Sequence, residues 1–292
     1  IFDGKYYLAL ETKDYQDSRT KARQLGGTLV AIKSQEENQF IAEKFSPSYW
    51  AIYTGSRNTG GTRSWDDGSV FSYTNWQPTS NGMQENVKII LKNDFASWEV
   101  GWEKGGWHGV PIGDTAHPTR TELFNGRSTA SAYLSEIPLS YFSITDASFR
   151  EGKGGDITIT RTGGTTTSQT IKVKSSDGTA TTADDDYAAI DKTITFAKGE
   201  TKKTISVSTT EDLDVEEDET FKLTITAEGS DEVPPQISDG TATVTIKADD
   251  FKRGDSLYSI VDGPSWKQAE SNSVALGGHL VTINDAEENQ WI

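Results

Sequence analysis

The sequence of 292 residues contains no cysteine, one methionine and only three histidines. Without cysteine the chain has no disulfide, no thiolate zinc site and no cysteine nucleophile. The histidines, His108, His117 and His279, lie far apart and offer little to a nitrogen-rich transition-metal site. These shortages leave carboxylate oxygens as the main metal-binding groups of this chain.

Positive charge is also scarce, because 28 Lys and Arg stand against 44 Asp and Glu, a formal net charge of −16. Binding to phosphate backbones needs clustered Lys and Arg, so nucleic acid is excluded as an expected partner. No apolar run approaches the roughly 20 residues of a membrane-spanning helix, so we expect no membrane insertion.

The most unusual stretch is residues 211–221, which places seven carboxylates in its first nine positions. Alternating strand patterns flank the stretch, at residues 204–208 before it and 221–225 after it. A sheet would therefore concentrate negative charge at one of its ends, where like charges repel. Calcium, which takes six to eight oxygen ligands in flexible geometry, is the natural counter-ion. The stretch predicts a calcium site.

An internal repeat with a constant offset of 251 residues relates the two ends of the chain. Residues 25–32 recur as residues 276–283, and residues 36–41 recur as residues 287–292. The sequence therefore predicts one complete unit, a spacer and the incomplete first part of a second unit. We expect that last part to lack the partner strands that would bury its apolar face.

The first unit has a mixed α and β pattern. Strands are predicted at residues 6–10 and 29–32, and a helix begins at Tyr15 after Asp14 as N-cap. Ser34 and Glu37 have the spacing of a capping box in front of a second helix.

The spacer reads as all-β. Residues 139–250 carry 22 acidic and 11 basic residues, so 11 of the 16 net negative charges lie here. Short segments separated by Gly-containing turns alternate between apolar and polar residues and predict a seven-strand antiparallel β-sandwich. The segments are residues 141–144, 156–160, 170–174, 193–196, 205–207, 221–225 and 242–246.

The first unit resembles a C-type lectin-like domain of the cysteine-free bacterial kind. The resemblance rests on residues 25–32, 50–55, 65–68, 73–78, 85–87, 106–107 and 132–137. It implies an α+β lectin-like fold and a multidomain chain. The expected domains are 1–138 (lectin-like), 139–250 (spacer) and 251–292 (the truncated N-terminal part of a second lectin-like unit).

The spacer resembles a Calx-beta domain through residues 161–164, 176–180, 186–187, 195–200, 216–221 and 239–246. The resemblance implies calcium held at one end of the sandwich by acidic loops, with two or more ions sharing carboxylates. The matching positions, with Glu211 as an added ligand, are Glu151, Asp186, Glu211, Asp212, Glu216, Glu219, Asp249 and Asp250. The alternative is a solvated acidic rim that holds no metal.

Sugar-binding C-type lectins hold calcium through a Glu-Pro-Asn or Gln-Pro-Asp loop and a Trp-Asn-Asp segment. Here the loop reads Gln77-Pro78-Thr79 in one register and Thr79-Ser80-Asn81 in another. The later segment reads Trp107-His108-Gly109, so most oxygen ligands are missing. Ligand contacts would then come from Gln77, Asn81, Glu85, Asn86, Trp102, Trp107 and His108. In the other interpretation the aromatic residues fill the core of their own loop.

These observations favour a binding protein and not an enzyme, because no histidine lies in a nucleophile–base motif and the carboxylates are explained by metal. We expect a calcium-binding adhesion or surface protein of a bacterium, a repeat protein located outside the cell. Its Calx-beta spacer would be stiffened by Ca²⁺ between lectin-like domains that bind glycans or other surface proteins. The alternative is a self-assembling structural surface protein whose lectin-like domains pack on one another without binding sugar.

Overall fold

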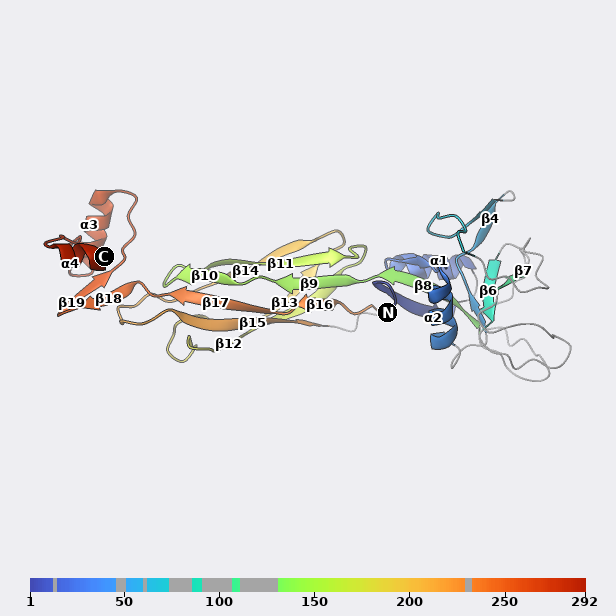
Figure 1. The fold of residues 1–292 in the computed structure, drawn as a ribbon, viewed down its shortest axis with the longest axis horizontal. Helices are drawn as coiled ribbons and strands as arrows, with labels where there is room; N and C mark the ends of the chain where they lie inside the picture. The colour runs from blue at the N-terminus through green and yellow to red at the C-terminus, as the bar shows by residue number, and fades with distance from the viewer. Residues whose placement is uncertain are drawn as a thin grey trace.

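The computed structural model describes residues 1–12, 15–45, 51–59, 62–73, 86–90, 107–110, 131–228 and 233–292. Figure 1 shows three parts in a row. A mixed unit with two helices lies at one end, a long β-sandwich occupies the middle, and a small hairpin-and-helix part lies at the other end.

The first unit contains two helices, α1 (Tyr15–Gln24) and α2 (Gln35–Phe45). Its strands are β1 (Lys5–Leu10), β2 (Thr28–Leu29), β3 (Ala51–Tyr53), β4 (Arg57–Thr59), β5 (Thr62–Ser64), β6 (Asn86–Ile90), β7 (Trp107–Val110) and β8 (Ser131–Pro138). Within the described residues the main sheet has the order β1-β8-β3-β6-β7, and β2 also pairs with β8. The late strand β8 thus lies among the elements that begin the unit, and closes its core.

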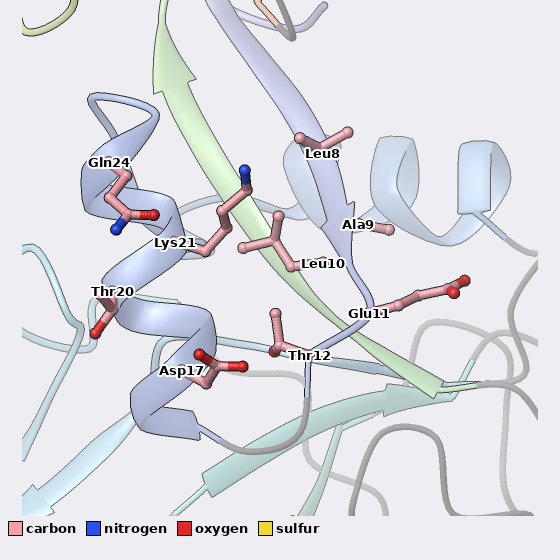
Figure 2. Close-up of a pocket in the computed structure, with 9 residues that line it drawn as sticks. All are labelled: Leu8, Ala9, Leu10, Glu11, Thr12, Asp17, Thr20, Lys21 and Gln24. Carbon is pink, nitrogen blue, oxygen red and sulfur yellow. The ribbon is translucent and has the colours of Figure 1, made fainter.

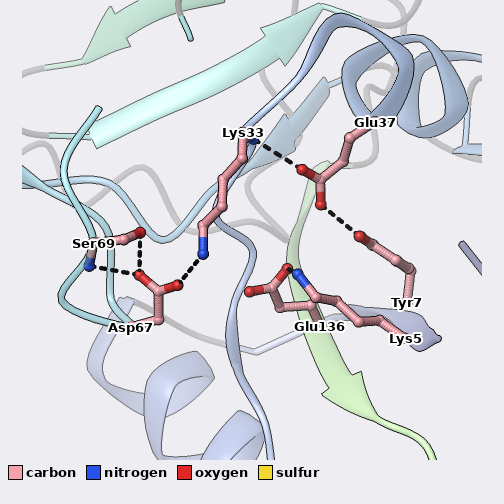
Figure 3. Close-up of polar contacts among 7 residues, drawn as sticks. All are labelled: Lys5, Tyr7, Lys33, Glu37, Asp67, Ser69 and Glu136. Atoms are coloured by element: carbon pink, nitrogen blue, oxygen red, sulfur yellow. Dashed lines mark hydrogen bonds and ion pairs between the residues drawn. The ribbon is translucent and has the colours of Figure 1, made fainter. Parts of the chain in front are cut away.

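The start of α2 confirms the predicted capping box in part. The hydroxyl of Ser34 accepts a hydrogen bond from the backbone N–H of Glu37 at 3.1 Å. The Glu37 carboxylate accepts from the backbone N–H of Lys33 and from the hydroxyl of Tyr7, and not from Ser34 (Figure 3). Glu37 therefore fixes α2 to β1 as well as capping the helix.

The middle part is a sandwich of a five-stranded sheet, β10-β17-β15-β12-β13, and a four-stranded sheet, β14-β11-β9-β16. The strands are β9 (Ser140–Ile144), β10 (Ala147–Arg150), β11 (Gly155–Gly163), β12 (Gln169–Ser176), β13 (Asp191–Phe196), β14 (Lys202–Val207), β15 (Glu219–Ala227), β16 (Gln236–Asp239) and β17 (Thr241–Lys247). All seven predicted strands are present. The sequence pattern missed the short strands β10 and β16.

The two missed strands make the sandwich only partly antiparallel, which corrects the predicted topology. The chain passes from β9 in one sheet to β10 in the other, and again from β16 to β17. Both β10 with β17 and β16 with β9 pair in parallel. The side chain of Asp146, between β9 and β10, accepts a hydrogen bond from the backbone N–H of Thr243 at 2.7 Å. These crossings tie the two sheets together at their edges.

The last part contains the hairpin β18 (Asp250–Arg253) and β19 (Ser256–Ser259), followed by α3 (Trp266–Ala275) and α4 (Ala286–Trp291). Helix α3 begins and ends 251 residues after α1, and α4 begins 251 residues after α2. The sequence repeat is therefore also a repeat of local structure. Among the described residues, no helix has both the length and the apolar character needed to cross a bilayer.

Candidate metal centre

Four acidic segments meet at the end of the sandwich that faces β18 and β19. Strands β10 and β17 run in parallel and pair Arg150 with Lys247, so the residues that follow both strands emerge together. The backbone N–H of Glu151 donates to the carbonyl of Lys247 at 3.1 Å. Strand β15 runs in the opposite direction and begins at Glu219, which pairs with Ile246. The acidic segment that precedes β15 therefore lies at the same end of the sandwich.

Asp249 and Asp250 are the most unusual of these residues, because both are fully buried. None of their four carboxylate oxygens has a hydrogen-bond partner. Glu151 is also buried, with 7% of its surface exposed. A buried carboxylate without a partner is costly, and proteins compensate such groups by pairing or by metal coordination. The Arg150 guanidinium, with Nε 3.2 Å from Oδ2 of Asp249, compensates one of these two carboxylates in part.

Asp186, Glu216 and Glu219 form a second group, in which one carboxylate oxygen of each lies within 4.8 Å of the others. The loop holds Asp186 in place, because its Oδ2 accepts from the backbone N–H of Thr181 at 2.6 Å. Its carbonyl accepts from the backbone N–H of Thr210 at 3.0 Å. The position of Asp186 is thus fixed by the protein before any ligand arrives.

Glu211 and Asp212 lie on the exposed side of the cluster. Gly152 has φ of +63°, and a Cβ added there would lie 2.1 Å from Oε2 of Glu211. A glycine at this position therefore permits both the left-handed backbone and the close approach of Glu211. Asp212 turns back on its own loop, since its Oδ1 accepts from the backbone N–H of Asp214 at 2.8 Å.

Burial and mutual repulsion raise the pKa of three glutamates in the cluster. Burial, and then the negative charge of Asp212, raises the pKa of Glu151 to about 7. Burial, and then the charge of Asp186, raises the pKa of Glu219 to about 7, and the same two causes raise the pKa of Glu216. Like charges placed this close favour protons or another cation between them.

The positive side chains of Arg150 and Lys153 border the cluster. Burial, and then the charge of Glu211, raises the pKa of Asp249 to about 6, against the opposing effect of Arg150. Arg150 also contacts Asp262 beyond β19, with Nη2 and Oδ1 2.5 Å apart, and Lys153 pairs with the same Asp262. Sequence reasoning missed this contact because β10, which ends at Arg150, has too short a pattern to be recognised.

All eight acidic residues that the sequence singled out lie at this end of the sandwich, near enough for their charges to act on one another. Of the remaining acids in residues 211–219, Asp218 forms an ion pair with Lys247 of the neighbouring strand β17. Glu217 lies exposed beside Glu216. Only some of the acidic residues in 211–219 therefore belong to the cluster.

The ligand-binding residues predicted in the first unit are not placed by the structure. Gln77, Asn81, Glu85 and Trp102 lie outside the described residues. Asn86 lies on β6 and Trp107 and His108 lie on β7, where the description covers the backbone alone. The two strands pair, with His108 opposite Lys88.

A pocket of about 390 Å³ lies between β1 and α1 of the first unit (Figure 2). Its walls combine apolar side chains such as Leu8 and Leu10 with Glu11, Asp17 and Lys21. Both signs of charge are present, and none of these three charged side chains is buried. The charged side chains of this pocket therefore do not share one sign, as those of the acidic cluster do.

Two families match this chain. Residues 11–102 match the Lectin C-type domain, and residues 136–250 match the Calx-beta domain. The crystal structure of the apo-form Calx CBD1 domain is similar over 38% of this chain and 99% of that one, with 19% identity and a TM-score of 0.33. At so low a score, the fold assignment rests on the family match and the strand order.

Several curated relatives match as well. The low affinity immunoglobulin epsilon Fc receptor of Mus musculus is 33% identical over 89 residues, which are 30% of this chain and 27% of that protein. The perlucin-like protein of Mytilus galloprovincialis is 30% identical over 77 residues, 24% of this chain and 49% of that protein. The chain spans about half or less of the length of these relatives.

The chain is therefore multidomain, with a C-type lectin domain followed by a Calx-beta domain, and it contains no cysteine. Both families consist of binding domains. Together they place the chain among binding proteins whose chemistry is related to calcium.

Proposed function

We propose that this chain is part of an extracellular adhesion or surface protein in which calcium binds the acidic end of the sandwich. The observation that carries the proposal is the pair of buried aspartates, Asp249 and Asp250, whose four carboxylate oxygens accept no hydrogen bond. Arg150 offsets part of this cost for Asp249, with Nε 3.2 Å from Oδ2, but among the described residues no Lys or Arg forms an ion pair with Asp250, so a bound cation would supply the missing compensation.

The donor set fits calcium in particular. Every candidate ligand is a carboxylate, and hard cations such as Ca²⁺ take oxygen ligands. The ligands we assign are Glu151, Asp186, Glu211, Asp212, Glu216, Glu219, Asp249 and Asp250. They fall into one group around Asp249 and Asp250 and another around Asp186, so we assign more than one ion.

Bound calcium would supply the counter-charge that the cluster lacks. The protein's own part is to hold the ligands in place beforehand. Thr181 fixes Asp186, and Gly152 admits Glu211. Because Asp250 is also the first residue of β18, calcium would join the sandwich to the hairpin that follows.

We assign residues 1–138 to the lectin-like domain, 139–250 to the spacer and 251–292 to the N-terminal part of a second lectin-like domain. The matching bounds of α1 with α3, and of α2 with α4 at its first residue, support the last assignment. In this arrangement a calcium-stiffened spacer separates lectin-like domains that contact glycans or other surface proteins. The elongated arrangement of the three parts in Figure 1 agrees with a spacer role.

A thermal melt tests the calcium site in the whole chain. Calcium at a hundredfold excess over Kd should stabilise the sandwich by about 2.7 kcal/mol relative to EDTA. Glu216→Gln should reduce this gain, whereas Glu217→Gln, its exposed neighbour in the same acidic stretch, should preserve it. A melting temperature that is equal in EDTA and in millimolar calcium would refute the proposal.

The alternative function is self-assembly without sugar binding, in which the lectin-like domains pack on one another. A glycan array in calcium and in EDTA, combined with light scattering, separates the two. Glycan binding by a monomer supports adhesion, and self-association without glycan binding supports assembly.

A further inference from the structure

The first unit and the sandwich meet at a joint that has no linker. Strand β8 ends at Pro138 and β9 begins at Ser140, so Leu139 alone separates the two strands. The backbone N–H of Leu139 donates to the carbonyl of Gly4 in the first unit at 3.2 Å. Its carbonyl accepts from the backbone N–H of Gly164 in the sandwich at 2.8 Å. The connecting residue is therefore held by both units and does not have the freedom of a flexible linker.

A hydrophobic cluster with members from both units fills this joint. Its buried members are Ile137 of β8, Leu139 and Val233, which lies before β16 of the sandwich. The partly buried side chains packed against them are Tyr6, Leu8, Leu25 and Tyr141. Domains move relative to one another by default, but a hydrophobic interface that both of them share opposes such motion. The cluster therefore favours a fixed orientation of the two units.

A buried arginine shapes the sandwich's side of the joint. Arg161 is 1% exposed, and its guanidinium donates to neutral oxygens. Nη2 donates to the carbonyl of Thr167 at 2.8 Å and to the hydroxyl of Ser140 at 3.0 Å, and Nε donates to the carbonyl of Gly164 at 3.1 Å. A buried guanidinium is costly unless its N–H groups are satisfied. These bonds therefore hold the loop between β11 and β12, residues 164–168, in one shape.

This loop contacts the end of helix α1. The hydroxyl of Thr166 donates to the carbonyl of Gly26 at 2.7 Å. Gly26 has φ of +84°, and a Cβ added there would lie 2.2 Å from Oγ1 of Thr166 and 2.9 Å from Cγ2 of Thr167. The glycine therefore permits both the left-handed turn that ends α1 and the close approach of the loop.

The joint and the acidic cluster lie at opposite ends of the sandwich. Strand β8 enters the sandwich at one end, and β18 leaves it at the other (Figure 1). None of the eight carboxylates of the cluster belongs to the residues that form the joint. A cation bound at the cluster therefore makes no direct contact with the joint.

We propose that the first unit and the sandwich form one rigid, cooperatively folded body whose joint needs no calcium. The hydrophobic cluster stabilises the joint, and Arg161 positions the loop that contacts Gly26. A glycan or protein bound by the lectin-like domain is thus held in a fixed direction relative to the spacer, and calcium acts at the other end of that spacer. The role of calcium here rests on the proposed function, whereas the rigidity of the joint does not.

A distance between two spin labels tests the joint directly in the whole chain. Because the chain contains no cysteine, the double variant Gln39→Cys and Lys222→Cys places one label on exposed α2 and the other on the exposed face of β15. Pulsed electron paramagnetic resonance in EDTA should give one narrow distance distribution, and calcium should leave its mean and width unchanged. A broad distribution in EDTA, or one that becomes narrow only in calcium, would overturn the proposal.

The variant Val233→Lys tests the shared cluster. Val233 is buried in the joint and is not a member of the hydrophobic core of the sandwich. A lysine there should therefore broaden the distance distribution in EDTA while the sandwich keeps its fold. Val274→Lys, the same substitution at an exposed position on α3, is the control and should leave the distribution narrow.

Tryptophan fluorescence supplies a second readout, because no tryptophan lies in residues 139–250. Trp65 is fully buried in the first unit, whereas Trp266 and Trp291 of the last part are exposed, so the signal reports mainly on the first unit. If the two units unfold together, Val233→Lys should lower the midpoint of this transition by at least about 4 °C, although the substitution lies in the sandwich.

An unchanged fluorescence midpoint in Val233→Lys, or a distance distribution as narrow as that of the control, would overturn the proposal. The label pair alone requires no change at the joint, so its distribution decides the question even where Val233→Lys fails to fold. Because these measurements are made in EDTA, their failure leaves the calcium melts of the proposed function unaffected. A chain that binds no calcium would, conversely, still give the narrow distribution.

Discussion

The guanidinium of Arg150 lies beside the carboxylate of Asp249, with Nε and Oδ2 3.2 Å apart but no hydrogen bond between them. The same arginine forms an ion pair with Asp262. One side chain therefore links the acidic cluster of the sandwich to the part of the chain that follows it. A cation bound at Asp249 would compete with Arg150 for that carboxylate, and would therefore affect the ion pair between Arg150 and Asp262.

The first prediction concerns this link. Asp262→Asn should leave the melting temperature of the sandwich nearly unchanged, because Asp262 is exposed and surface ion pairs contribute little to stability. It should nevertheless loosen the last part of the chain, which small-angle scattering would detect as a broader distribution of maximum dimension. Asp255→Asn, in the exposed turn between β18 and β19, is the control and should not alter the scattering.

The second prediction concerns Gly152. Gly152→Ala should cost about 1–2 kcal/mol from the left-handed backbone alone, and it should also displace Glu211 and weaken calcium binding. Gly199→Ala is matched, because Gly199 has φ of +82° with nothing within 4 Å of an added Cβ. The control should lose stability in denaturant unfolding but keep its calcium affinity. Equal calcium affinities for both variants would contradict the placement of Glu211.

The third prediction is a pH dependence. The pKa values of Glu151 and Glu219 rise from 4.5 to about 7 in the folded protein, and that of Asp249 rises from 3.8 to about 6. The folded state therefore binds protons more tightly than the unfolded state, so this stabilisation is full below the unfolded pKa values and is lost as pH rises through 6 to 7.

In EDTA the melting temperature of the sandwich should accordingly fall between about pH 5 and pH 8. Saturating calcium should remove the fall, because the cation replaces the protons. Glu219→Gln should flatten the curve in EDTA. A melting temperature that rises through this window in EDTA would show that the carboxylates do not repel one another as the structure indicates.

The fourth prediction concerns the first unit. Tyr7 and Glu37 are both buried, and the Tyr7 hydroxyl donates to the Glu37 carboxylate at 2.5 Å (Figure 3). Tyr7→Phe should therefore destabilise this unit by about 2 kcal/mol, the usual size for a hydrogen bond to a charged group. Tyr258→Phe changes the repeated contact in the last part, where Tyr258 donates to Glu288 at 2.9 Å, and should leave the unfolding of the first unit unchanged. Equal losses in that unit from both variants would contradict this account.

Much of the site could be predicted from the sequence, because carboxylates at strand ends follow from two simple patterns. Alternation located the strands that end near Asp249 and begin near Glu219, and the density of acid in residues 211–219 indicated a metal. The resemblance to a known family added the distant members Glu151 and Asp186.

The rest depended on contacts that no local pattern encodes. Strands β10 and β16 have four residues each and bury little, with Phe149 and Ile237 as their main apolar side chains, so alternation over so short a length was not decisive. The ion pair of Arg150 with Asp262 depends on where the hairpin after Asp250 lies, and tertiary structure sets that position. The orphaned oxygens of Asp249 and Asp250 likewise became evident only with the burial of both residues.

Calorimetric titration of the whole chain with calcium tests the central claim most directly. The account predicts binding of more than one ion to the unmodified chain. It also predicts at least about a tenfold loss of affinity in Asp250→Asn, since even indirect metal contacts are worth 10- to 100-fold, with Glu217→Gln unchanged. Heat that is absent at millimolar calcium, or a titration that Asp250→Asn leaves unaltered, would contradict it.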